Sequence, residues 1–172
     1  MKYFPSENIT YRTSLSTEEV YQRLSENTEP QKLMRFKGFG ANKNHKTYEG
    51  RVTKNNFHIS RIIGYRNSFL PQIAGEIRSS GSGSVVDVKM NLHVLVWIFI
   101  AVWVLVVLSF GIGFFVSGTG AEGQEWVALI PVGMSLFVYL MALGGFKFES
   151  RKTIQNLGEL LEATAGENVK EW

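Results

Sequence analysis

Two long runs without charge constrain this chain more than any other feature. Residues 94–116 read VLVWIFIAVWVLVVLSFGIGFFV, and residues 126–146 read WVALIPVGMSLFVYLMALGGF. At about 1.5 Å of rise per residue, a helix of either length covers roughly the 30 Å hydrocarbon core of a bilayer. A buried helix of a soluble protein rarely stays apolar on every face over that distance. The two runs therefore predict a pair of transmembrane helices.

The charges beside the predicted spans indicate their orientation. The connecting loop, residues 117–125, holds two glutamates and no lysine or arginine. Basic residues lie on the other side of both spans, at Lys89, Lys147, Arg151 and Lys152. Cytoplasmic flanks of membrane helices are rich in Lys and Arg, so both termini are predicted to be cytoplasmic. The first ten residues lack the apolar core of a secretory signal, and we expect the first span to be internal.

The net charge of +3 is distributed unevenly. Residues 1–91 carry +6, residues 92–146 carry −2 and residues 147–172 carry −1. A domain at +6 is attracted to an anionic inner leaflet, which makes membrane lipids expected partners. The basic residues are scattered and accompany no nucleic-acid-binding motif, so nucleic acid is not an expected partner.

Alternating apolar residues predict the secondary structure before the first span. We expect strands at residues 8–15, 46–53, 57–63, 72–78 and 85–92. Ser16 and Glu19 have the spacing of a capping box, which predicts a helix that continues through Glu26. Residues 54–56 predict a tight turn, and residues 79–84, SSGSGS, predict a loose one. The last four strands form an antiparallel meander in this prediction.

The predicted fold is an α+β membrane protein whose cytoplasmic part is interrupted by a transmembrane hairpin. Residues 1–91 form the first cytoplasmic part, and residues 92–146 form the hairpin, with spans at about 94–116 and 126–146. In residues 147–172, apolar positions from 148 to 164 predict an amphipathic helix that Gly166 stops. We expect this helix to pack on the basic domain rather than to lie on the anionic membrane surface, because its later charges are acidic.

The loop GYRNSFLP, residues 64–71, carries apolar side chains that an exposed loop usually avoids. In an up-and-down meander it lies at the end of the sheet from which the chain enters the first span. Tyr65, Phe69 and Leu70 can then enter the headgroup region while Arg66, and Arg61 with it, meets lipid phosphates. Two alternatives stay open: these residues cover the domain's own core, or they bind a partner protein.

Small residues recur at every fourth position of the first span, at Ser109, Gly113 and Ser117. Such a ridge lets two helices approach closely. We favour its packing against the chain's own second span, where Gly133, Ala142 and Gly144 offer small surfaces. Self-association, or packing against a partner's span, is the alternative.

No catalytic or metal-binding pattern is recognisable. The three histidines, His45, His58 and His93, have no second ligand at helical spacing, and the chain has no cysteine. We therefore expect no enzyme activity, no metal and no cofactor.

Two resemblances add to this interpretation. The order of strand, capped helix, meander and C-terminal helix, together with the opening ITYRTSLSTEEVYQRL, resembles a reduced helix-grip fold of the START or Bet v1 type. That resemblance implies a cavity for a lipid-like molecule. The stretch YEGRVTKNNFHISRIIGYRNSFLPQIAGEI is similar to one in uncharacterised bacterial two-span membrane proteins, which implies the bacterial inner membrane.

The expected function is that of a non-enzymatic inner-membrane protein, a binding or accessory subunit of a membrane assembly. Its expected partners are lipids and either another membrane protein or further copies of itself. One alternative is a module that binds a lipid or another apolar ligand. Another is a membrane-disrupting effector or an immunity-type protein.

Overall fold

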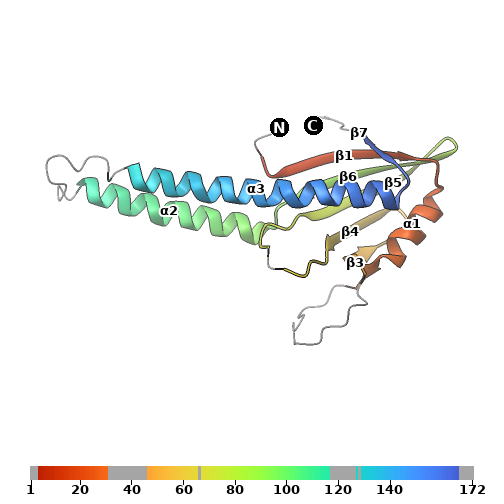
Figure 1. Cartoon of the computed structure of the whole chain (residues 1–172), viewed down its shortest axis with the longest axis horizontal. Helices are drawn as coiled ribbons and strands as arrows, with labels where there is room; N and C mark the ends of the chain where they lie inside the picture. The colour runs from red at the N-terminus through yellow and green to blue at the C-terminus, as the bar shows by residue number, and fades with distance from the viewer. Residues whose placement is uncertain (1–3, 31–45, 66, 117–126, 128, 167–172) are drawn as a thin grey trace.

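A computed structural model describes residues 4–30, 46–65, 67–116, 127 and 129–166 of the 172-residue chain. The strands are β1 (Ser6–Thr13), β2 (Thr28–Glu29), β3 (Tyr48–Val52), β4 (Asn56–Arg61), β5 (Gln72–Ser80), β6 (Gly83–Asn91) and β7 (Thr164–Gly166). The helices are α1 (Thr17–Glu26), α2 (Val94–Val116) and α3 (Leu129–Leu160). Figure 1 shows α2 and α3 projecting side by side from one end of a sheet domain.

The strands form one seven-stranded sheet in the order β2-β3-β4-β5-β6-β1-β7. Neighbouring strands are antiparallel except β2 and β3, which are parallel. The predicted α+β fold and the meander from β3 to β6 are confirmed. The sequence prediction missed the two-residue β2 and the three-residue β7, which are too short to show an alternating pattern.

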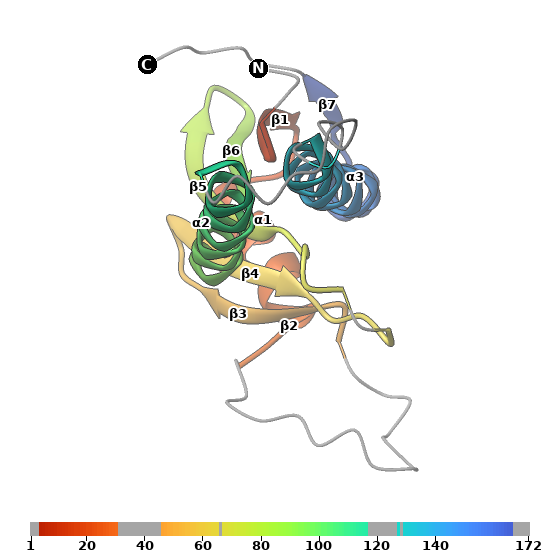
Figure 2. The ribbon, with the colours of Figure 1, turned by 90° about the vertical axis from the view of Figure 1, so that its left-hand side faces the viewer.

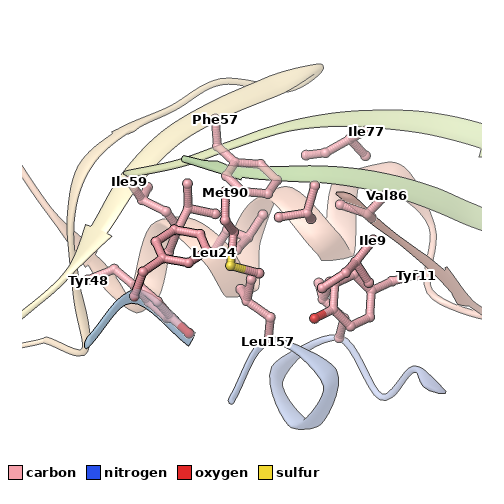
Figure 3. Packing of buried hydrophobic residues seen from close by; sticks show 14 of the residues in the cluster. Ile9, Tyr11, Leu24, Tyr48, Phe57, Ile59, Ile77, Val86, Met90 and Leu157 are labelled. Carbon is pink, nitrogen blue, oxygen red and sulfur yellow. The ribbon is translucent and has the colours of Figure 1, made fainter. Parts of the chain in front are cut away.

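The core lies on one face of the sheet, which we call the inner face. Most strand residues that point to it are apolar and buried, as the alternation of the strands requires, and the charged exceptions, Glu7 and Arg61, lie at the end of the sheet next to the apolar hairpin. Figure 3 shows Tyr11, Phe57 and Met90 converging on Leu24 of α1 and Leu157 of α3. Each of these five side chains is at most 1% exposed. Both helices therefore cover the inner face.

Helix α1 begins with the predicted capping box. The Glu19 amide donates a hydrogen bond to Ser16 Oγ at 3.3 Å, and the Ser16 amide donates to Glu19 Oε2 at 2.8 Å. The Ser16 hydroxyl also donates to Glu19 Oε2, at 2.8 Å. The two bonds that Oε2 accepts from Ser16 lower the pKa of Glu19, because they favour the charged carboxylate. The two bonds made by the amides of Ser16 and Glu19 also satisfy backbone donors at a helix start, where the helix itself provides no acceptor.

We expect Ser16→Ala to destabilise the protein by about 1 kcal/mol, since it removes the acceptor of the cap. Thermal unfolding of the full chain in nanodiscs measures this change. Ser14→Ala is the matched control, because Ser14 is exposed and lies just before the helix. Equal midpoints for the two variants would contradict a role for the cap.

The turn between β5 and β6 differs from the prediction. Residues 79–84 were expected to form a loose loop, but Ser79 pairs with Ser84 and Ser80 pairs with Gly83. The hairpin therefore turns through two residues only, and Gly81 has a φ of +57°, a left-handed conformation that glycine adopts without strain. The serine-rich and glycine-rich composition suggested a flexible linker and concealed the continuing strand pairing.

The second apolar run and the predicted C-terminal helix are one helix. Helix α3 runs without interruption for 32 residues, a length of about 48 Å, from the apolar hairpin onto the inner face of the sheet. The prediction separated the two segments because the composition changes at Lys147. A change of composition does not end a helix, however, and no proline lies in the part of α3 after Pro131. The helix ends at Leu160, and Gly166, predicted as the helix stop, belongs to β7.

The two helices of the apolar hairpin contact each other where a glycine of α2 meets a proline of α3. A Cβ atom on Gly111 of α2 would lie 2.8 Å from Pro131 Cγ of α3, so the helices touch there. Closer to the sheet, Ile100 of α2 and Ala142 of α3 are both buried. Figure 2 looks along the pair and shows α2 and α3 side by side. Both helices are long and apolar enough to cross a membrane.

Candidate functional site

The candidate site is the junction between the sheet domain and the apolar hairpin. Only Leu92 and His93 separate the last residue of β6 from the first residue of α2. The loop between β4 and β5 lies at this same end of the sheet, because β5 starts where antiparallel β6 ends. The chain thus brings this loop, the start of α2 and the middle of α3 together, as Figure 1 shows.

A buried carboxylate forms the centre of the junction. Glu149 of α3 is completely buried, and its Oε2 lies 3.0 Å from Nη1 of Arg61 at the end of β4. The hydroxyl of Tyr65 donates a hydrogen bond to Glu149 Oε1. That bond raises the pKa of Tyr65, because it stabilises the protonated phenol. The carboxylate therefore joins β4, the loop and α3.

A second ion pair joins β1 to the same part of α3. Lys147 Nζ contacts Glu7 Oε1, and the two side chains are 24% and 26% exposed. Glu149 and Glu7 are thus each neutralised by a described partner, Glu149 by Arg61 and Glu7 by Lys147.

Positions along the two antiparallel helices can be matched from their contact. Val94 and Phe148 each lie 17 residues from the contact of Gly111 with Pro131, so they lie at the same level. Ile100 and Ala142, each 11 residues from that contact, are both buried, which agrees with the match. Phe148 therefore lies level with the first residue of α2.

Aromatic side chains contact both helices of the hairpin near this level. Phe4 stacks on Trp97 with ring centroids 5.4 Å apart. Phe69 lies against α3, since a Cβ atom on Gly145 would be 2.9 Å from Phe69 Cδ2. Tyr65 and Phe148 lie beside Glu149. We call Phe4, Tyr65, Phe69 and Phe148 the aromatic collar.

Lys152 extends over the collar from the next turn of α3. Its Nζ is 4.0 Å from the ring centroid of Phe148 and 5.8 Å from that of Tyr65. Arg151 beside it is exposed. Neither cation forms an ion pair with a carboxylate of the described residues.

The structure places the predicted loop residues as follows. Tyr65 is 46% exposed, whereas Phe69 and Leu70 are half-buried, and Phe69 packs on the core and on α3. Arg66 lies outside the described residues. Arg61, which was expected to meet lipid phosphates, instead binds Glu149.

The expectation that the small-residue ridge packs on the second span is wrong for its described members. The Ser109 hydroxyl donates to the Leu105 carbonyl of its own helix at 2.7 Å. Gly113 is exposed, and nothing lies within 4 Å of a Cβ atom placed on it. Gly111, two positions earlier, makes the contact instead. Ser117 lies outside the described residues.

Sequence reasoning missed Phe4, Phe148, Glu149 and Lys152 as junction residues. Glu149 has a signal in the sequence, since it is the one acidic residue of KFESRK. The burial of Glu149 can be inferred only once α3 is known to be continuous, because the continuous helix places Glu149 against β4. Phe4 and Trp97 are 93 residues apart in sequence, and no local pattern predicts that their rings stack.

The inner face of the sheet is filled by the chain's own side chains. Tyr11 donates a hydrogen bond to the Ile154 carbonyl of α3 at 3.0 Å, while the hydroxyl of Tyr48 has no hydrogen-bond partner among the described residues. Burial raises the pKa of both, that of Tyr48 to about 12. Side chains of this size occupy the place where a helix-grip domain would hold an apolar ligand.

We expect stability to fall as the pH rises from 10 to 12, because unfolded tyrosine ionises near 10 while folded Tyr48 does so at about 12. Tyr48→Phe removes a titrating group and a buried hydroxyl without a partner, so it should reduce this loss and leave stability at pH 7 unchanged or slightly higher. Thermal midpoints across this pH range measure the effect. An unchanged alkaline slope would mean that Tyr48 does not contribute.

The opposite face of the sheet, the outer face, carries no helix in the described part of the chain. A hollow of about 500 Å³ lies on it, lined by Asn56, His58, Ala74, Glu76, Asp87 and Lys89. It forms because Ala74 is shorter than His58 and Lys89, its register partners on both sides. Asp87 accepts a hydrogen bond from Thr10 and pairs with Arg78.

Neither the junction nor the outer face has the composition of a metal site. Among the described residues, no three His, Cys, Asp or Glu side chains lie close enough to hold a metal ion. His58 is exposed on the outer face, and His93 Nδ1 accepts a hydrogen bond from the Leu95 amide at 3.1 Å. His45 lies outside the described residues.

No protein-family model matches the chain, and neither curated proteins nor solved structures contain a significant match to it. No residue role can therefore be carried over from a relative.

Proposed function

We propose that this chain is a non-enzymatic integral protein of the bacterial inner membrane that serves as a binding or accessory subunit of a membrane assembly. Helices α2 and α3 cross the bilayer, and both termini lie in the cytoplasm. The sheet domain rests on the inner leaflet and presents its outer face to a partner protein.

The observation that carries this proposal is the continuity of α3. One helix begins in the apolar hairpin and ends on the inner face of the sheet, where Leu157 is fully buried. The α2 side is joined as closely, since only two residues separate it from β6. In the proposed bilayer, these two connections hold the sheet domain at a fixed angle to the membrane. A fixed angle suits a subunit that presents one surface to a partner protein.

The two faces of the sheet differ in a way that favours binding over storage of a ligand. The inner face is closed by α1, α3 and its own large side chains. The outer face is polar and accessible, with exposed Arg12, Arg51 and Lys89 and a hollow over Ala74. The alternative of an apolar-ligand module has no comparable support.

Single-cysteine labelling tests the membrane arrangement, because the natural chain contains no cysteine. We expect Glu122→Cys, in the loop between the two helices, to react with an impermeant reagent on intact spheroplasts. Lys54→Cys, in the sheet domain, should react only after permeabilisation. The reverse pattern, or extraction of the protein by alkaline carbonate, would reject the arrangement.

Photo-crosslinking in cells tests the binding role. A photoreactive residue in place of His58, on the outer face, should capture one defined protein. The same residue in place of Gln155, which is exposed on the helical side of the domain, is the matched control. Capture from neither position, or equal capture from both, would reject the outer face as the binding surface.

A further inference from the structure

We infer that the junction contains a binding site for the phosphate of an anionic phospholipid, formed by Lys152 and Arg151 above Tyr65 and Phe148. This inference rests on the proposed membrane insertion and adds to it a lipid class and a defined site. It also moves the expected phosphate contact from Arg61, which binds Glu149, to Lys152 and Arg151 of α3.

The charges of the junction favour an anion at this place. Arg61 is used by Glu149, and Lys147 is used by Glu7. Lys152 and Arg151 have no carboxylate partner within the described part of the chain. Two unneutralised cations on consecutive residues of a helix therefore remain at the edge of the apolar hairpin.

The height of Lys152 matches the headgroup layer. Helix α2 is about 35 Å long, close to the hydrocarbon thickness, so its first residue marks the cytoplasmic boundary of the hydrocarbon. Phe148 lies level with that residue, and Lys152 is one turn, about 6 Å, further from the hairpin. The headgroup region extends over a similar distance on each side of the hydrocarbon.

The aromatic rings give the site an apolar base. Phe148 is 58% exposed and Tyr65 is 46% exposed, although both are large and lie beside a neutralised junction. Aromatic side chains are enriched at the membrane interface, where the ring contacts glycerol and acyl groups. Lys152 is held over both rings by cation–π contacts, which orient its ammonium group toward the same layer.

Continuity with the hairpin selects a lipid of the surrounding bilayer as the occupant. Phe148 and Lys152 are on the same helix as the apolar residues that would contact acyl chains. A phospholipid can place its tail on α3 and its phosphate at Lys152, whereas a free phosphate ion would contact the cations alone.

The test uses the whole chain reconstituted in nanodiscs that contain equal amounts of phosphatidylcholine and phosphatidylglycerol, and then released from them. Native mass spectrometry measures which lipid the protein retains. We expect wild type to retain more phosphatidylglycerol than phosphatidylcholine. In the Arg151→Gln/Lys152→Gln variant, the ratio of the two retained lipids should fall about fivefold for each cation removed. Lys152→Arg alone, which keeps the charge, should keep the preference.

The matched control is Arg12→Gln/Arg51→Gln, which removes two exposed cations from the sheet domain away from the junction. It should retain lipid as wild type does. Equal retention by the junction variant and wild type would overturn the inference, as would full displacement of phosphatidylglycerol by inorganic phosphate at physiological concentration. Failure of membrane insertion is read separately, from the carbonate extraction and cysteine labelling described above.

Discussion

Replacement of Glu149 by alanine is expected to destabilise the protein by about 3–5 kcal/mol. The change leaves the Arg61 guanidinium, whose side chain is only 15% exposed, without its carboxylate, and the Tyr65 hydroxyl without its acceptor. A buried charge that loses its partner pays its full desolvation cost. For a chain of this length the thermal midpoint should fall by on the order of 10 °C, measured in nanodiscs at a constant scan rate.

Two further variants separate the lost ion pair from other causes. Glu159→Ala, an exposed position on the same helix, should leave the midpoint within about 0.5 kcal/mol of wild type. The double variant Arg61→Met/Glu149→Leu should recover most of the loss, since an apolar pair of similar volume often replaces a buried ion pair without cost. If the double variant is as unstable as Glu149→Ala, the stability of this site depends on the shape and hydrogen bonds of the native side chains and not on the pairing of their charges.

The sequence predicts the domain elements well where a local pattern exists. Ser16 and Glu19 mark the start of α1, and the alternation of Val86, Val88 and Met90 marks β6. The position of the loop at residues 64–71 follows from strand order alone. Elements without a local pattern, such as the short edge strands β2 and β7, form only because a neighbouring strand supplies their hydrogen bonds.

The junction was only partly predictable for a different reason. Tyr65 and Phe69 are conspicuous in a loop, so their place at the membrane-facing end could be argued. Their actual partners, Glu149 and Gly145, are on a helix that the change in composition at Lys147 divided into two. Once α3 is continuous, the 3.6-residue periodicity places Phe146, Glu149, Thr153 and Leu157 on the buried face, and the site follows.

The small-residue ridge was assigned to the wrong contact for a different reason. Spacing by four residues identifies a helix face, but it does not say which neighbour that face meets. The orientation of α2 is fixed at its start by β6 and at its far part by the contact of Gly111 with Pro131. Ser109 and Gly113 then point away from α3.

Leu157→Ala is the second change with a large expected effect, a loss of about 2–5 kcal/mol. Leu157 is fully buried between α3 and the sheet, among Tyr11, Leu24 and Met90, so its truncation leaves a cavity where the helix joins the domain. Gln155→Ala, exposed on the same helix, is the control and should have little effect. Thermal unfolding in nanodiscs measures the difference.

Hydrogen exchange on Leu157→Ala should show where the stability is lost. We expect faster exchange in β1, β6 and α1, whose core residues contact the truncated position, and unchanged protection in the apolar part of α3, which in the proposed bilayer is held by lipid and α2. Loss of protection along the whole of α3 would mean that the hairpin depends on the domain. Loss confined to the domain would mean that the apolar pair is an independent anchor, to which the sheet is fixed through one helical face.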